Sequence, residues 1–186
     1  MRHLPALLAL SIALAACSIH TLVDENTRQS IAGRYSVDPQ VAWSRVNQGG
    51  VELWTVDGPA LESIRFYPGL RDGETFMTAR DRTELPAFRA DMQASEIMEF
   101  VVDSIARAGA GQVQATGLRP MNFGPLPGFR FELSYLTDNG LEMQGLVAGA
   151  ATDGELHLIV YSGASLYYFP KYEDDVERII DSIEML

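Results

Sequence analysis

The sequence contains few residues that form disulfides or bind metals. Its 186 residues include one cysteine and three histidines. A disulfide within the chain is therefore excluded, and no zinc site with three or four clustered ligands is expected. Positive charge is also scarce: Lys and Arg total 14 against 25 Asp and Glu, for a net charge of −11. This balance argues against nucleic acid and anionic lipid as partners.

Long apolar runs are absent too, since no segment reaches the roughly 20 apolar residues that span a bilayer. The overall composition is that of a globular protein, with 47% hydrophobic and 21% charged residues. The length fits one domain, which is large enough to bury a core without a disulfide or a metal.

The first residues have the order of a bacterial lipoprotein leader. Residues 2 and 3 are basic, residues 4–13 are almost wholly apolar, and residues 14–17 read Leu-Ala-Ala-Cys. The apolar run is too short to span a membrane but suits a secretory signal. The four residues resemble a lipobox, in which the cysteine takes a diacylglyceryl group before cleavage on its N-terminal side. We therefore expect a signal peptide over residues 1–16 and lipidation at Cys17.

The residue after the cysteine carries the sorting information in the lipoproteins that this chain resembles. There, Asp retains the protein in the inner membrane, whereas Ser permits transfer to the outer membrane. Ser18 thus predicts a Gram-negative outer-membrane protein that faces the periplasm. Residues 17–32 are expected to be the lipidated cysteine and a polar tether, which could hold the domain up to roughly 45 Å from the lipid.

Residues 33–186 are expected to form a single α+β domain. Alternation and turn residues predict strands at 35–37, 51–56, 61–67, 112–117, 129–137, 141–150 and 155–161. Apolar residues spaced by three and four predict one helix over 90–108 and a terminal helix over 171–185, with Glu173, Asp174 and Asp175 in its first turn. Strands 51–56 and 61–67 should form a hairpin, and the last three strands a meander.

This order of elements resembles the PsbP-like fold group. The closing run Tyr168-Phe169-Pro170-Lys171-Tyr172 and the apolar stripe after it look like that group's last helix. The resemblance implies an antiparallel β-sheet covered by two main helices, an α/β/α sandwich. It also implies a binding or assembly module without shared catalytic residues, so no functional residue is carried over.

Motifs for catalysis are hard to find. His157 is the one histidine inside the expected domain, and it lies on a predicted strand, where a residue of the sheet face is the simplest interpretation. No phosphate-binding loop or nucleophile elbow is present, and no cofactor is expected. The candidate binding residues are aromatic: Trp43 and Trp54, which could stack on sugars, and Tyr167 and Tyr168, which could form a partner patch.

The sequence thus favours an outer-membrane-anchored lipoprotein with a non-catalytic periplasmic domain that binds or assembles. Its partners would be the membrane, through the lipid, and an envelope protein. Two alternatives stay open: a tethered envelope hydrolase that uses His157 with nearby carboxylates, and a carrier of a small or lipidic ligand. A cavity with apolar walls would favour the carrier.

Overall fold

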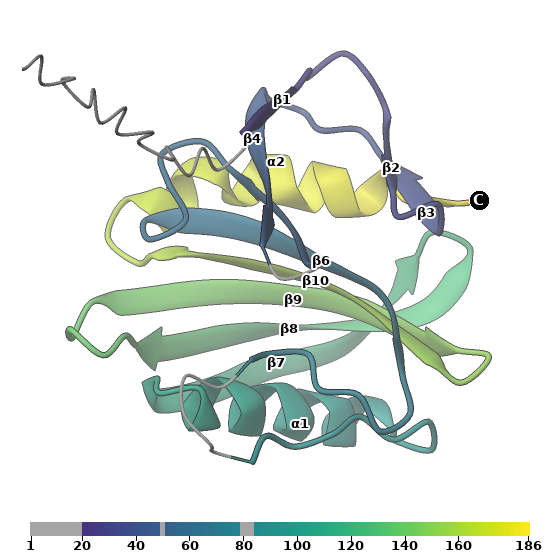
Figure 1. The fold of residues 1–186 in the computed structure, drawn as a ribbon, viewed down its shortest axis with the longest axis vertical. Helices are drawn as coiled ribbons and strands as arrows, with labels where there is room; N and C mark the ends of the chain where they lie inside the picture. Colours follow the sequence, from purple (N-terminus) through teal and green to yellow (C-terminus); the bar gives the residue numbers. More distant parts are fainter. Residues whose placement is uncertain (1–19, 49–50, 79–83) are drawn as a thin grey trace, which may run out of the picture.

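A computed structural model describes residues 20–48, 51–78 and 84–186. Its centre is an eight-stranded antiparallel sheet in the order β1-β4-β5-β6-β10-β9-β8-β7. Helix α1 lies on one face of this sheet and helix α2 on the other (Figure 1), which confirms the predicted α/β/α sandwich. The strands of this sheet are β1 (Thr21–Val23), β4 (Trp43–Gln48), β5 (Val51–Thr55), β6 (Glu62–Arg71), β7 (Gly111–Phe123), β8 (Leu126–Leu136), β9 (Glu142–Thr152) and β10 (Glu155–Ala164). The helices are α1 (Ala94–Arg107) and α2 (Tyr168–Asp181).

A second, three-stranded sheet has the order β11-β3-β2. Its strands are β2 (Gln29–Ile31), β3 (Tyr35–Val37) and β11 (Glu184–Met185). Arg28, just before β2, joins it to the end of α2, because its guanidinium donates to the backbone oxygens of Ser36 and Ser182. Within the described part of the chain, neither helix has the length and apolar character needed to cross a bilayer.

The structure corrects the predicted tether over residues 17–32. Residues from Thr21 onward belong to the fold, since β1 pairs with β4 and β2 pairs with β3. Val23 and Ile31 are buried in the core on the α2 side. Burial of these two apolar side chains holds the segment against the domain, so residues 21–32 belong to the fold and not to a tether. Cys17 and Ser18 lie outside the described residues.

The predicted hairpin and meander are confirmed: β5 pairs with β6, and β8, β9 and β10 pair in sequence order. Several boundaries differ from the predicted ones. Strand β6 runs through Pro68 to Arg71, because the register shifts opposite Pro68 at His157. Strand β7 continues past Gly117 to Phe123. Helix α1 begins at Ala94 instead of Ala90.

Helix α2 also begins earlier than predicted, at Tyr168, so its first turn holds no acidic residue. The predicted placement of Glu173, Asp174 and Asp175 in that turn was therefore wrong. The predicted apolar stripe was right: Val176, Ile179 and Ile180 are buried against the sheet. This stripe, together with Tyr35, Trp43 and Trp54, forms the core on the α2 side.

The core on the α1 side is built from the other faces of the same strands. Ile97, Phe100, Val101 and Ile105 of α1 pack on it. Further residues of this core come from the strands and from the segment before α1: Tyr67, Phe76, Phe88, Phe129, Phe131, Leu133, Val147, Leu156, Leu158 and Val160. Because α1 spans only 14 residues, it leaves the end of the sheet beyond its C-terminus uncovered, and the candidate site lies there.

Candidate functional site

A cleft opens between the C-terminal end of α1 and strands β6, β8 and β10. Its volume is about 370 Å³, within the range of about 300–1,000 Å³ that is usual for small-molecule sites. Its apolar walls come from Tyr67, Phe76, Met77, Ile105, Ala108, Ala110, Leu133 and Val160. The cleft therefore suits a ligand with an apolar body.

Small side chains explain why the cleft lies at this point of the sheet. Ser162 on β10 lines the cleft, and its neighbours across the ladder are Ser63 on β6 and Gly145 on β9. A Cβ atom at Gly145 would lie 3.0 Å from the backbone oxygen of Tyr161 and 3.2 Å from Leu133 Cβ. This row of short side chains leaves a hollow in the sheet surface where α1 has already ended.

Arg65 brings a positive charge to this apolar cleft. It lies on β6 opposite Val160 of β10, and it is half-buried. Among the described residues its guanidinium has no hydrogen bond and no ion pair. No nitrogen atom of Arg65 is fully buried, so the guanidinium is open to the cleft and available to a ligand. An anionic group in the cleft would supply a partner, and a carboxylate or phosphate would fit its planar fork.

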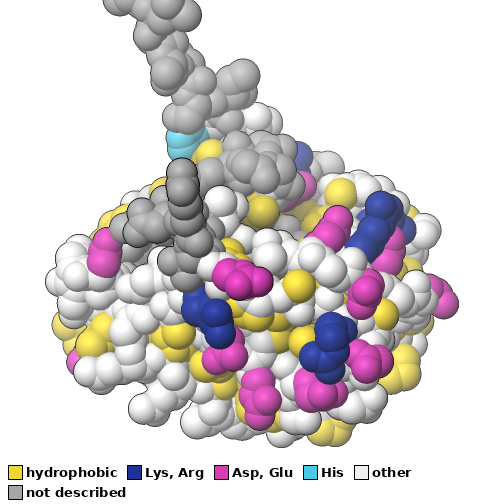
Figure 2. Space-filling view, turned by 60° about the horizontal axis from the view of Figure 1, so that its bottom comes forward, with side chains coloured by type: hydrophobic (Ala, Val, Ile, Leu, Met, Phe, Trp, Pro, Cys, Tyr) yellow, Lys and Arg dark blue, Asp and Glu magenta, His cyan; other side chains and the backbone are white. Residues whose placement is uncertain are grey.

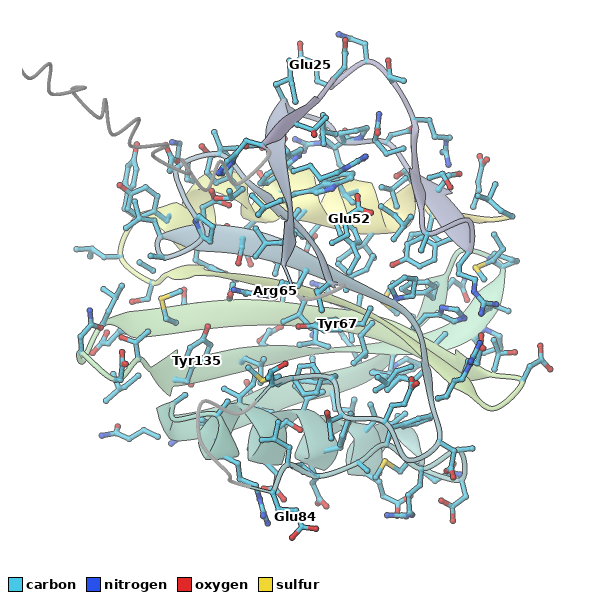
Figure 3. All side chains as sticks on the ribbon, viewed as in Figure 1. Glu25, Glu52, Arg65, Tyr67, Glu84 and Tyr135 are labelled. Carbon is cyan, nitrogen blue, oxygen red and sulfur yellow. The ribbon has the colours of Figure 1, made fainter. Side chains whose placement is uncertain are left out.

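Two tyrosines stand beside this charge. Figure 3 shows Arg65 and Tyr67 on β6 and Tyr135 on β8, and all three line the cleft. Burial raises the pKa of Tyr67 to about 12, although the nearby Arg65 charge opposes this effect. The Tyr67 hydroxyl therefore stays protonated near neutral pH and can donate a hydrogen bond to a ligand.

The second arginine of the cleft differs from Arg65. Arg107 is exposed, and its guanidinium donates to the backbone oxygen of Glu84 at 3.2 Å. It lies in the last turn of α1, where a cation is favoured by the helix dipole. Arg107 thus has a structural role at the rim, which makes it a matched control for Arg65.

His157 lies away from this cleft, in the core on the α2 side. Its ring stands 6.1 Å from that of Tyr35 and 6.3 Å from that of Phe123. Its buried Nδ1 atom has no partner among the described residues, and burial lowers the pKa of the imidazole. In the described part of the chain no serine or carboxylate makes a hydrogen bond to His157. The hydrolase alternative therefore finds no assembled triad here.

The four predicted aromatic residues separate into two groups. Trp43 and Trp54 are fully buried, and their indole nitrogens donate to Pro39 O and Glu52 Oε1 at 2.8 Å each. They are core residues and cannot stack on a sugar at the surface, so this part of the prediction was wrong. Tyr167 is exposed and Tyr168 half-buried; both lie in or next to the turn that precedes α2, outside the cleft.

Sequence reasoning missed Arg65, Tyr67 and Tyr135. A signal existed for the first: Arg65 stands inside a strand between Ile64 and Phe66, where a solvent-facing charge is the ordinary explanation. Only the structure shows that its side of the sheet is half-covered. Among the described residues no group of three or more His, Cys, Asp or Glu is placed to hold a metal.

Comparison with known proteins supports the fold. No family model and no curated protein matches the sequence. The solution structure of cyanobacterial PsbP (CyanoP) from Synechocystis sp. PCC 6803 is similar, with a TM-score of 0.56 and 12% identity over 96% of this chain and 99% of that chain. LpqN of Mycobacterium tuberculosis, described as involved in cell envelope biogenesis, gives a TM-score of 0.39 and 9% identity over 92% and 87% of the two chains. The first of these shows that the chain has a PsbP-like fold.

Proposed function

We propose that this chain is an outer-membrane lipoprotein with a non-catalytic, periplasm-facing domain that binds a small amphipathic anion. The anchor would be the lipid on Cys17, and Ser18 would direct the protein to the outer membrane. The bound molecule would place its apolar body against Phe76, Ile105 and Leu133 and its anionic group at Arg65.

The observation that carries this proposal is the positive charge of Arg65 in a cleft with apolar walls, where this side chain has no ion pair among the described residues. An anion there would form charge-assisted hydrogen bonds with Arg65, and each such bond contributes about 1.5–3 kcal/mol. The neutral Tyr67 hydroxyl would add a donor. Cleft size and apolar walls favour the carrier of a small or lipidic ligand over a module that binds only another protein.

The anionic fluorophore 8-anilinonaphthalene-1-sulfonate tests the cleft, because it joins an aromatic body to one sulfonate. We expect Arg65→Met to weaken its binding about tenfold or more, since 1.4 kcal/mol is a tenfold change in affinity. Arg107→Met is the control and should bind as the wild type does. Equal affinities in the wild type and Arg65→Met would contradict the proposed site. Unfolding curves of both variants check that the probe reports the folded protein.

The anchor is tested separately in the native host by palmitate labelling and separation of the two membranes. Cys17→Ala should remove the label and release the protein or leave an uncleaved precursor. Ser18→Asp should keep the label but retain the protein in the inner membrane. Wild-type protein without label would refute the anchor, and labelled wild-type protein in the inner membrane would refute the sorting alone.

A further inference from the structure

Exposed apolar side chains gather at one end of the molecule. Six large hydrophobic side chains are exposed among the described residues. Five of them are in β1 or in three turns, namely 56–61 between β5 and β6, 137–141 between β8 and β9, and 165–167 before α2. They are Leu22, Val56, Leu141, Leu166 and Tyr167. Leu166 is 96% exposed, the largest value among them.

Backbone contacts show that the three turns lie together. Ala164 N donates to Leu61 O at 2.9 Å, and Ser165 N donates to Glu142 O at 3.0 Å. The turn before α2 is thus joined to both other turns. Figure 1 shows all three at the same end of the sheet, and the C-terminus at the opposite end. We call these three turns, 56–61, 137–141 and 165–167, the turn end of the molecule.

Strand β1 begins close to this end and runs toward it, because it is antiparallel to β4, which is antiparallel to β5. Leu22 pairs with Ser44 on β4, and Ser44 pairs with Thr55 on β5, the residue before Val56. Leu22 therefore lies two strands from the turn end. Only residues 18–20 separate Thr21 from Cys17, so the Cα atoms of Cys17 and Thr21 lie at most roughly 14 Å apart even when the chain is fully extended.

From these observations we infer that the turn end rests on the lipid leaflet that holds the anchor. This inference depends on the proposed lipidation of Cys17. With so short a connection the domain must lie close to the membrane, and the turn end, about 10 Å from Leu22 across two strand spacings, is the exposed apolar surface within that reach. The side chains found there, Leu166 and Tyr167 above all, are those that favour the boundary between headgroups and acyl chains.

The charges at the turn end are compatible with a zwitterionic leaflet. Lys171 Nζ lies 2.7 Å from Asp57 Oδ2, so this cation and this acid neutralise one another. The same ammonium lies 5.6 Å from the centre of the Tyr167 ring. Because the whole chain carries a net charge of −11, attraction to anionic lipid cannot supply the contact. The contact is therefore apolar and insensitive to salt. This apolar contact is also too small to hold the protein on the membrane by itself. The lipid anchor would keep the turn end close to the leaflet and so raise its effective concentration there.

The cleft opens at the same end. Thr137 and Asp138 line it and belong to the turn that carries Leu141. Figure 2, which views the α1 side, shows acidic and basic side chains interspersed with apolar ones instead of one continuous charged field. A cleft whose rim faces the leaflet would exchange its ligand with the membrane. The small amphipathic anion proposed above would then be a membrane amphiphile with a single acyl chain and an anionic head.

A thiol-reactive environment-sensitive dye tests the orientation on the full, lipidated chain. Cys17 is the only cysteine and its sulfur is consumed by the lipid, so Leu166→Cys or Leu186→Cys supplies the only free thiol. Leu186 is 71% exposed and lies away from the turn end, which makes it the control. In vesicles of phosphatidylethanolamine and phosphatidylcholine, we expect blue-shifted emission and quenching by spin-labelled lipid at position 166 but not at 186.

The outcomes separate this inference from the proposed anchor. Mass spectrometry that shows no diacylglyceryl group on Cys17 would refute the anchor, and the inference with it. A lipidated protein with equal quenching at both positions, or with none at position 166, would refute the contact alone. In a second measurement, Leu166→Asp should slow the uptake of a fluorescent fatty acid from vesicles while its affinity for 8-anilinonaphthalene-1-sulfonate stays unchanged. Unchanged uptake would refute loading from the leaflet.

Discussion

Glu62 is a buried carboxylate that fastens a turn through hydrogen bonds but loses solvation of its charge, and substitutions can separate these two effects on stability. Its Oε1 atom accepts hydrogen bonds from Thr55 Oγ1 at 2.7 Å, Val56 N at 2.6 Å and Asp57 N at 2.8 Å. Its Oε2 atom is buried and has no partner among the described residues. Burial raises the pKa of this carboxyl, and the three hydrogen bonds only partly oppose that shift. Oε1 thus holds the turn after β5 in place, while the unpartnered Oε2 disfavours the charged carboxylate and so favours the protonated acid.

We predict different outcomes for two substitutions of Glu62. Glu62→Leu leaves Val56 N and Asp57 N without an acceptor, whereas Thr55 Oγ1 keeps the backbone oxygen of residue 62 at 2.8 Å. Each lost acceptor for a buried donor costs about 1–3 kcal/mol. Because both amides are only partly buried, water can replace part of the lost hydrogen bonding. We therefore expect the free energy of unfolding to fall by about 2–4 kcal/mol. Glu62→Gln keeps an acceptor oxygen for both amides and removes the charge, although its Nε2 group replaces the unpartnered Oε2 atom, so near neutral pH it should be more stable than Glu62→Leu.

The pH dependence gives the sharper test. Since the pKa of Glu62 is raised in the folded state, its favourable contribution is complete below the pKa of an unfolded glutamate. It is lost as the pH rises through the folded-state pKa. Each pKa unit of the shift corresponds to about 1.4 kcal/mol. Urea unfolding of the chain lacking residues 1–17 measures the free energy of unfolding from about pH 4 to about pH 8.

Subtracting the wild-type free energy of unfolding from that of Glu62→Gln cancels the titration of all other groups. The difference should grow in favour of Glu62→Gln as the pH rises. A difference that stays flat, or that shifts in favour of the wild type as the pH rises, would show that the charged carboxylate is well solvated in the fold. The reasoning from its unpartnered oxygen would then be wrong.

Three further predictions concern the core on the α2 side and the central sheet. Ile180→Asp places a charge in the core on the α2 side and should lower the free energy of unfolding by about 3–5 kcal/mol. The control Asp181→Asn changes an exposed residue and should leave the free energy of unfolding unchanged. An unchanged melting temperature for Ile180→Asp would show that α2 is peripheral to the core. Gly149→Ala sets a Cβ atom 2.6 Å from the backbone oxygen of His157 and should prevent normal pairing of β9 with β10, while Gly111→Ala, with 3.9 Å of room, should be tolerated. Full stability of both would contradict this packing. Burial lowers the pKa of the His157 imidazole, so folding favours its neutral form and the wild type should lose stability as the pH falls below about 6.5. His157→Gln should not show this loss. Parallel stability profiles against pH for the two proteins would contradict the prediction.

Local signals explain which elements could be predicted. The turn 138–140 and the apolar stripe of α2 act over a few residues, and the elements beside them were found. Pairing of β10 with β6 joins Ser162 to Ser63 across about a hundred residues of chain, and no local pattern encodes it. Strands β1 and β2 have three residues and one buried side chain each, so they show no alternation and resemble a polar tether.

Strand β7 shows a different difficulty. Gly117 and Pro120 indicate the end of a strand, yet β7 continues to Phe123. The register shifts between Thr116 and Arg119, where Gly117 adopts a φ of +67°. Because β7 is an edge strand, a bulge and a missing proline N–H cost little there. Tertiary context also hid the site residues. Arg65 resembles any solvent-facing arginine of a strand, and only the packing of α1 over part of its sheet face places it in a cleft.

Antiparallel topology explains why the apolar turns and the cleft meet at one end. Strands β5, β8 and β10 all finish at this end, and each is followed there by one of the three turns. Strand β7 runs opposite to β8, so it starts at the same end, and α1, which precedes it directly, must finish there. The cleft beyond α1 therefore necessarily borders the turns. An insertion in turn 137–141 would change the rim of the cleft and the proposed membrane contact together, whereas an insertion in turn 153–154, at the far end of β9 and β10, would change neither.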